Sequence, residues 1–217
     1  MTYIGIDFSL NSPAVCIQDN KGNYKFISFF NFGNRLWDSE KMPKAFSLHK
    51  ELSDDNTILA IPYNREVDSK EFLIRERQKL NDGSAIAELM SNILVTFCGT
   101  QNVTIGLEGF SYGSTGNSFI DIVQYNTFLR NELLQAYGSE KINVFQPSHV
   151  KKLAGKGNAN KHYMVKAFQD DVLNDKDLRN TKLWKWCKGK DFSEKIPKPL
   201  DDLVDSYFIL KSIQANQ

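Results

Sequence analysis

Two short apolar segments of the chain each end on a single carboxylate. Residues 3–6 lead into Asp7, and residues 103–107 lead into Glu108. An apolar strand that stops at a polar residue is typical of α/β sheets, in which functional side chains lie beyond the strand ends. If these two strands are neighbours in one sheet, both carboxylates project from the same edge.

The rest of the chain alternates between strand and helix patterns. One strand pattern begins at residue 2 and resumes at residue 14, a turn follows at 19–23, and further strands are predicted at 24–32, 58–61, 103–107 and 141–145. Apolar residues at helical spacing predict helices at 85–97, 119–137, 148–153 and from 200 to about 213, and the charged residues 69–79 are a further helix candidate. We therefore expect a single α/β domain over residues 1–217, built on a mixed five-stranded sheet flanked by helices.

The last predicted helix starts with three aspartates, Asp201, Asp202 and Asp205. Acidic residues at the start of a helix can cap it, which explains one or two of them. Asp202 and Asp205 are three residues apart and Asp201 and Asp205 are four apart, so either pair shares a helix face. With Asp7 and Glu108, such a pair makes a set of four carboxylates that suits Mg²⁺ or Mn²⁺. Two ions about 3.5–4 Å apart bind a phosphodiester and activate a water, which predicts a nuclease site.

The composition limits the partners and the compartment. The chain has 217 residues and a net charge of +1, but residues 149–199 hold 13 Lys and Arg against 6 Asp and Glu. A basic segment just before an acidic cluster suggests a polyanion held beside a cation site, although a solvated basic face explains it equally well. No apolar run reaches 18 residues, the N-terminus lacks a signal-peptide pattern, and the three cysteines are widely spaced. We therefore expect a cytoplasmic protein without membrane contact, disulfides or structural zinc.

Four segments of the chain, taken in order, resemble motifs of the RuvC-type Holliday junction resolvases of the RNase H-like superfamily. Residues 4–7 with Ser9 resemble the first-strand motif, and residues 105–108 resemble the second acidic strand. Residues 150–151 and 156–161 are similar to the family's basic segment. Residues 202–205 are similar to its terminal D-x-x-D motif, with Ser206 in place of the usual alanine. Two long insertions suggest a divergent or viral member, acting in a bacterium or an infected host cell.

The resemblance implies an RNase H-like fold and a crossover-junction endodeoxyribonuclease that cleaves four-way or other branched DNA as a homodimer. It implies that Asp7, Glu108, Asp202 and Asp205 are catalytic and hold two Mg²⁺ ions per site, with Mn²⁺ as a substitute. Asp201 is expected to cap the helix or to support the metal ligands. Basic residues expected at the DNA are Lys151, Lys152, Lys156 and Lys161. The apolar helix 119–137 suits a dimer contact, although a core helix has the same pattern.

The chain departs from the family pattern in two ways. The position three residues after the second acid, an aromatic wedge in the family, is Ser111, so we expect Phe110 or Tyr112 to contact DNA bases instead. Two segments, about residues 33–82 and 167–198, are longer than in compact family members. The second contains lysines interleaved with two tryptophans at 182–190, which suits contact with a DNA backbone and bases. A surface loop that the tryptophans pin to the domain has the same pattern.

Other functions share some of these residues. An RNase H-like nuclease acting on RNA–DNA hybrid, structured RNA or flap DNA would use the same four carboxylates, so only the substrate separates it from a resolvase. Residues 5–12 also resemble the first phosphate loop of actin-like ATPases. That class needs a second glycine-rich phosphate loop, which this sequence lacks, so an actin-like ATPase fragment is disfavoured. A non-catalytic junction-binding protein is disfavoured, because an idle carboxylate cluster costs stability.

Overall fold

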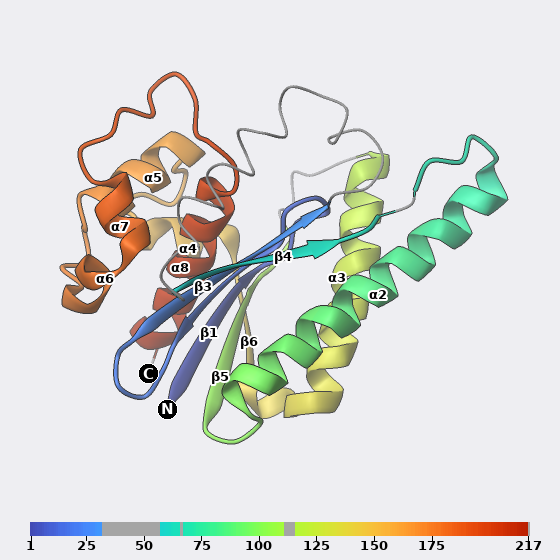
Figure 1. Cartoon of the computed structure of the whole chain (residues 1–217), viewed down its shortest axis with the longest axis horizontal. Coiled ribbons are helices and arrows are strands. Elements are labelled where there is room, and N and C mark those ends of the chain that lie inside the picture. Colours follow the sequence, from blue (N-terminus) through green and yellow to red (C-terminus); the bar gives the residue numbers. More distant parts are fainter. Residues whose placement is uncertain (32–56, 66, 111–115, 217) are drawn as a thin grey trace.

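A mixed β-sheet lies between two layers of helices (Figure 1). The computed structural model describes residues 1–31, 57–65, 67–110 and 116–216. The strands in this part of the chain are β1 (Thr2–Asp7), β2 (Ala14–Gln18), β3 (Tyr24–Asn31), β4 (Ile58–Tyr63), β5 (Val103–Glu108) and β6 (Ile142–Phe145). Their order across the sheet is β4-β3-β2-β1-β5-β6. β2 runs antiparallel to β1 and β3, whereas the pairs β3/β4, β1/β5 and β5/β6 are parallel.

The α/β class and the mixed sheet flanked by helices are as expected, but the described sheet has six strands instead of five. The extra strand comes from the N-terminal segment, which the apolar pattern made look like one interrupted strand. Residues 9–13 form a loop, and the chain reverses there, so that Asp7 pairs with Ala14 across an antiparallel ladder. The reversal brings this loop beside the carboxylate at the end of β1.

The helices divide between the two faces of the sheet. They are α2 (Phe72–Cys98), α3 (Asn117–Tyr137), α4 (Pro147–Leu153), α5 (Lys161–Gln169), α6 (Lys176–Asn180), α7 (Lys182–Cys187) and α8 (Leu200–Ala215), with a short 3₁₀ turn at Ser139–Lys141. α2 and α3 cover one face, and α4 to α8 lie on the other (Figure 1).

The two helix candidates at 69–79 and 85–97 are parts of one helix, α2. Asp82 and Gly83 separate the two patterns in the sequence, but both are buried inside the helix. A Cβ at Gly83 would lie 2.9 Å from the ring of Phe128, so the glycine allows α2 and α3 to approach closely. Asp82 pairs with Arg65 at 3.1 Å and accepts a hydrogen bond from Tyr125, which satisfies its charge inside the helix pair.

Each face of the sheet carries its own hydrophobic core. The core beneath α2 and α3 contains the inward side chains of β1 and β5, among them Ile4, Ile6 and Ile105. The opposite core is built around α8, and the short helices α4 to α7 close it. The region at 167–198 therefore belongs to the domain, because Leu183 and Trp184 of α7 are buried against this second core. In the region at 33–82, the described parts are β4, the residues that follow it and the first turns of α2. None of the helices in the described ranges has the length and apolar character needed to cross a membrane.

Candidate functional site

The first two acidic residues lie side by side at one edge of the sheet. β1 and β5 are parallel neighbours in which Ile6 pairs with Leu107. Asp7 and Glu108 are the next residues of these strands, and both are half-buried. The expectation that the two carboxylates project from the same edge is therefore confirmed.

Helix α8 reaches this edge because glycines on two strands let it rest on the sheet. Gly5 and Gly106 are register partners in β1 and β5. A Cβ at Gly5 would lie 2.2 Å from the carbonyl oxygen of Ser206 and 2.4 Å from the backbone nitrogen of Leu210. A Cβ at Gly106 would lie 3.0 Å from Ile213. The backbone of α8 thus packs directly on the backbone of β1, one residue away from Asp205.

The four predicted metal ligands are close enough to influence one another. Desolvation raises the pKa of Asp7 well above its usual range, and the like charges of Asp205, Asp202 and Glu108 raise it further. Desolvation also raises the pKa of Asp205 to about 7, with the charge of Glu108 as the next cause. Carboxylates that raise one another's pKa values lie within electrostatic range of one another. Three separate elements, β1, β5 and α8, supply this cluster.

Asp202 is held from two sides by groups that the sequence patterns did not single out. Its side chain is 2 % exposed. Ser12, in the loop after β1, donates a hydrogen bond to its Oδ2 atom at 2.6 Å, and Lys198 contacts both carboxylate oxygens at 2.9 and 2.8 Å. Desolvation and the charge of Asp201 nevertheless raise the pKa of Asp202. The loop between β1 and β2 is therefore part of the site.

Asp201 binds lysines. The residue before α8, Pro199, makes no side-chain capping bond, and Asp201 lies in the first turn of the helix. Its Oδ2 atom accepts from Lys161 and, at 2.9 Å, from Lys198. Although burial opposes the charge, hydrogen bonds from these two lysines lower the pKa of Asp201. Its other oxygen, Oδ1, is buried and has no hydrogen-bond partner among the described residues.

The remaining predicted DNA contacts lie on α4, on α5 and between them. Burial raises the pKa of Glu108, and the positive charge of Lys151 opposes this rise. Lys151 therefore lies near the acids. Lys152 and Lys156 are exposed, and Lys156 lies 4.2 Å from the ring centre of Tyr163. Lys161, at the start of α5, contacts Asp201 as described above.

Of the two aromatic candidates for DNA contact, Phe110 lies within the described residues. The ring of Phe110 packs edge-on against Phe119 of α3 at 5.9 Å, and the guanidinium of Arg130 lies 4.6 Å from its centre. Phe110 is half-buried in this arrangement, so part of the ring stays accessible. Tyr112 lies outside the described residues.

The donor chemistry of this cluster fits Mg²⁺ or Mn²⁺. All four predicted ligands offer oxygen only, and their raised pKa values mark a concentration of negative charge that a divalent cation relieves. In the ranges that the structure describes, no three side chains of Asp, Glu, His or Cys already surround a common point as a metal shell. Lysines neutralise part of the charge instead, since Lys198 and Lys161 contact Asp201 and Asp202.

Known structures resemble this one in fold. The similarity extends to RuvC from Thermus thermophilus, with 12 % sequence identity and a TM-score of 0.49, over 100 % of this chain and 96 % of that one. It extends also to the yeast mitochondrial Holliday junction resolvase Ydc2, with 15 % identity and a TM-score of 0.48, over 96 % of this chain and 75 % of that one. At these identities the likeness concerns the fold alone, and no protein-family model or curated protein sequence matches the chain.

Proposed function

We propose that the protein is a Mg²⁺- or Mn²⁺-dependent endonuclease that cleaves four-way or otherwise branched DNA. The observation that supports this most is the meeting of four carboxylates, from β1, β5 and α8, at one edge of the sheet. Such crowding of like charge does not stabilise a fold, because each added carboxylate makes the others harder to ionise. A cation site that works on phosphodiesters does have a use for it.

In this proposal Asp7, Glu108, Asp202 and Asp205 hold two metal ions. When bound, the ions would activate a water and neutralise charge on the phosphodiester, leaving 5′-phosphate and 3′-hydroxyl ends. The chain's own residues prepare the site. Ser12 fixes the orientation of the Asp202 carboxylate, and the packing of α8 on Gly5 fixes its distance from β1.

Lysines at the rim would meet the substrate. Lys151 is near Glu108, and Lys161 is half-exposed while its ammonium group contacts Asp201. Both can approach a DNA phosphate beside the acids and offset charge that develops on it. Lys198 contacts Asp202 directly, so metal binding by Asp202 requires this lysine to move toward Asp201 or toward solvent.

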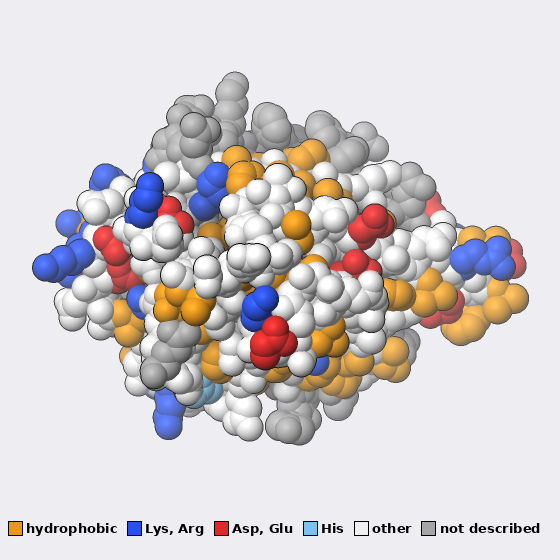
Figure 2. All heavy atoms as spheres, turned by 90° about the horizontal axis from the view of Figure 1, so that it is seen from below, with side chains coloured by type: hydrophobic (Ala, Val, Ile, Leu, Met, Phe, Trp, Pro, Cys, Tyr) orange, Lys and Arg blue, Asp and Glu red, His pale blue; other side chains and the backbone are white. Residues whose placement is uncertain are grey.

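We propose further that the active form is a homodimer. Several large apolar side chains on α2 and α3 are exposed, including Leu73 at 71 %, Phe72 at 63 % and Ile120 at 63 %. Figure 2 shows hydrophobic side chains gathered at the end of the molecule where α2 begins. A second copy of the chain would cover this surface, and its acid site would cut the opposite strand of a symmetric junction. Analytical ultracentrifugation tests this: a monomer at micromolar concentration would contradict it, and Leu73→Glu is expected to weaken the dimer.

Cleavage of a panel of substrates tests the function. An immobile four-way junction is incubated with Mg²⁺ beside duplex, flap and RNA–DNA hybrid, with Asp7→Asn as the inactive control. We expect cuts in the junction by the wild type alone. Activity on hybrid but not on junction would replace the resolvase proposal by a hybrid nuclease with the same residues. Full activity of Asp7→Asn would show that the acid cluster is not the site.

A further inference from the structure

Four lysines on α7 and the residues after it have no acidic partner in the part of the chain that the structure describes. Within the described ranges, Lys182, Lys185, Lys188 and Lys190 form no ion pair, and all but Lys182 are exposed. We call these four residues the α7 lysine cluster. Figure 2 shows Lys and Arg side chains at the end of the molecule that carries α6 and α7. No acidic residue separates Lys182, Lys185 and Lys188 in the sequence, whereas Asp191 follows Lys190.

Two members of the cluster are held in place by aromatic rings. The ammonium of Lys190 lies 3.4 Å from the ring centre of Trp186, and that of Lys188 lies 4.9 Å from the ring centre of Trp184. Trp186 in turn stacks on Phe192 at 5.9 Å. Trp184 is buried and donates its Nε1 hydrogen to the carbonyl oxygen of Phe168, so it anchors the segment and cannot stack on a base. Ordered lysines lose less side-chain entropy on binding an anion than free ones do.

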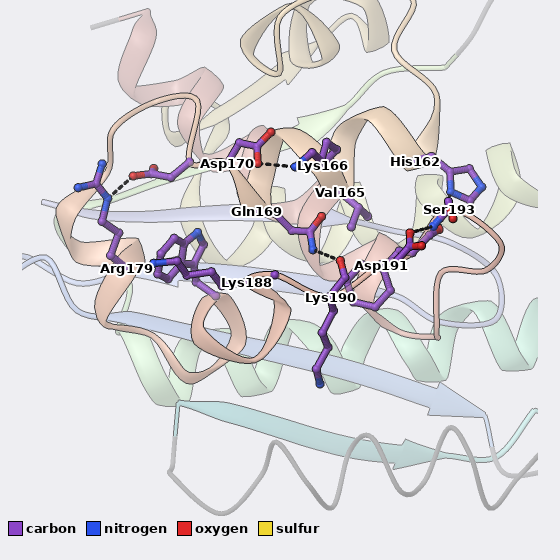
Figure 3. Close-up of a pocket in the computed structure, with 14 residues that line it drawn as sticks. His162, Val165, Lys166, Gln169, Asp170, Arg179, Lys188, Lys190, Asp191 and Ser193 are labelled. Atoms are coloured by element: carbon purple, nitrogen blue, oxygen red, sulfur yellow. Dashed lines mark hydrogen bonds and ion pairs between the residues drawn. The ribbon is translucent and has the colours of Figure 1, made fainter.

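The backbone beneath these lysines is also fixed. Gln169, near the end of α5, donates hydrogen bonds to the carbonyl oxygens of Cys187 at 2.7 Å and Lys190 at 2.8 Å. Figure 3 shows Gln169 reaching across from α5 to this oxygen of Lys190. The loop closes a hollow of about 870 Å³ between itself and α5.

The charges that line this hollow favour a ligand outside it. Lys166 pairs with Asp170 at 2.7 Å, and Arg179 pairs with Asp171, so their charges are already balanced (Figure 3). Among the charged lining residues that form no ion pair within the described ranges, Lys188 and Lys190 are positive and Asp191 is negative, which leaves a net positive charge. A small anion inside the hollow would face Asp170, Asp171 and Asp191 as well as the bases. A polyanion can also reach Lys185, which is exposed and lies outside the lining.

The cluster is connected directly to the acid site. His162 lies within hydrogen-bond distance of the carbonyl oxygen of Phe192, 3.0 Å from it, and the preceding residue, Lys161, contacts Asp201. The segment that follows the cluster, residues 191–198, ends beside the acids, because Lys198 contacts Asp201 and Asp202. A linear polyanion bound at the acids can therefore continue along this segment.

We propose that the α7 lysine cluster binds the phosphodiester backbone of a DNA arm that extends from the acid site. Lys182, Lys185 and Lys188 are spaced three residues apart along α7 and its end, which places such positions about 5–6 Å apart on one helix face. A row of regularly spaced cations suits a repeating phosphate chain better than a single phosphate. This inference rests on the proposed function, which makes DNA the polyanion.

DNA binding in the absence of cleavage tests the cluster. The double variant Lys188→Gln/Lys190→Gln is titrated with a fluorescent four-way junction, with Ca²⁺ in place of Mg²⁺, at several salt concentrations. Each lost phosphate contact lowers the slope of log K against log salt by about 0.9, so the double variant is expected to lose about 1.8 from the slope. At 0.1 M salt the same relation predicts affinity weaker by at least tenfold.

Two controls make the outcome specific. Lys21→Gln/Lys166→Gln removes two exposed lysines outside the cluster, one in the turn after β2 and one already paired with Asp170, and it is expected to change the affinity less than twofold. Lys188→Arg/Lys190→Arg keeps the charges and is expected to restore binding. An unchanged slope and affinity for the glutamine variant, with the wild type binding the junction, would overturn this inference and leave the proposed function standing. A wild type that does not bind junction at all would overturn both.

Discussion

A single methyl group at Gly5 is predicted to separate the two halves of the acid site. In Gly5→Ala the new Cβ would lie 2.2 Å from the carbonyl oxygen of Ser206, whereas an ordinary contact needs 3.4 Å or more. The obstacle is helix backbone, which cannot rotate aside. The helix α8 must therefore retreat by the difference between 3.4 and 2.2 Å, about 1.2 Å. Asp205 precedes Ser206 and must move with it, away from Asp7.

The expected cost has a structural and a catalytic part. Overpacking of a well-packed core costs about 1–3 kcal/mol, and for a chain of this size that lowers the melting temperature by about 2–12 °C. Displacement of catalytic groups by about 1 Å lowers the rate by about a hundredfold. Gly106→Ala is the matched control, because the atoms nearest its Cβ belong to the Ile213 and Ile209 side chains, at 3.0 and 3.1 Å. Side chains can adjust, so we expect a smaller loss of both stability and rate.

Calorimetry and junction cleavage, measured on the same preparations of both variants, distinguish the possibilities. At a temperature where Gly5→Ala is fully folded, its cleavage rate should still be far below that of Gly106→Ala. If Gly5→Ala melts at the wild-type temperature and cleaves at the wild-type rate, α8 does not rest on β1 as described. If both variants lose rate only in proportion to unfolding, the distance between α8 and β1 is not what sets activity.

Three further predictions concern the charges of the site. The pKa of Asp205, raised to about 7, exceeds its usual unfolded value of about 3.9, so the folded state holds a proton that the unfolded state has lost between these values. Stability of the metal-free protein should therefore fall as the pH rises from about 4 to about 7, and Asp205→Asn should flatten this fall in a series of melting curves; an unchanged slope would contradict the assignment. Mg²⁺ at a hundred times its dissociation constant should raise the free energy of unfolding by about 2.7 kcal/mol, seen as a rise in melting temperature of about 5–11 °C that Asp7→Asn abolishes. Asp201→Asn should keep this rise in melting temperature but lose about 1 kcal/mol of stability above pH 4. The reason is that the lowered pKa of Asp201 keeps the wild-type carboxylate ionised beside Lys161 and Lys198 at these pH values. Loss of the Mg²⁺ response in Asp201→Asn would show that Asp201 is a metal ligand.

Local sequence patterns were sufficient to predict the two carboxylates that lie at strand ends. Asp7 and Glu108 could be paired in advance, because each follows an apolar strand and parallel neighbours end at one edge. The aspartates of α8 could be placed on one helix face for the same kind of reason, since helical spacing is a local property. The prediction that these elements lie together came from the chemistry of the acid set, and the resemblance of the ordered motifs then supported it.

Contacts between distant parts of the chain could not be predicted in this way. The hydrogen bond from Ser12 to Asp202 joins residues 190 positions apart, and no periodicity encodes it. Gly5 and Gly106 admit α8 onto the sheet, and only the assembled sheet reveals this function. The missed sixth strand has a simpler cause: the loop at 9–13 carries no asparagine–glycine or aspartate–glycine pair to mark the reversal.

The most direct test of the central claim is the combined effect of Asp205→Asn on stability and on junction cleavage with Mg²⁺. Its raised pKa means that the ionised carboxylate opposes folding, so the variant should be at least as stable as the wild type at pH 8. Its cleavage rate should nevertheless fall by about a hundredfold or more, since a lost metal ligand costs several kcal/mol in the transition state. Asp170→Asn, which removes an exposed acid paired with Lys166, should leave the rate unchanged. Wild-type cleavage by Asp205→Asn would contradict the account, because the acid cluster would then have no part in the reaction.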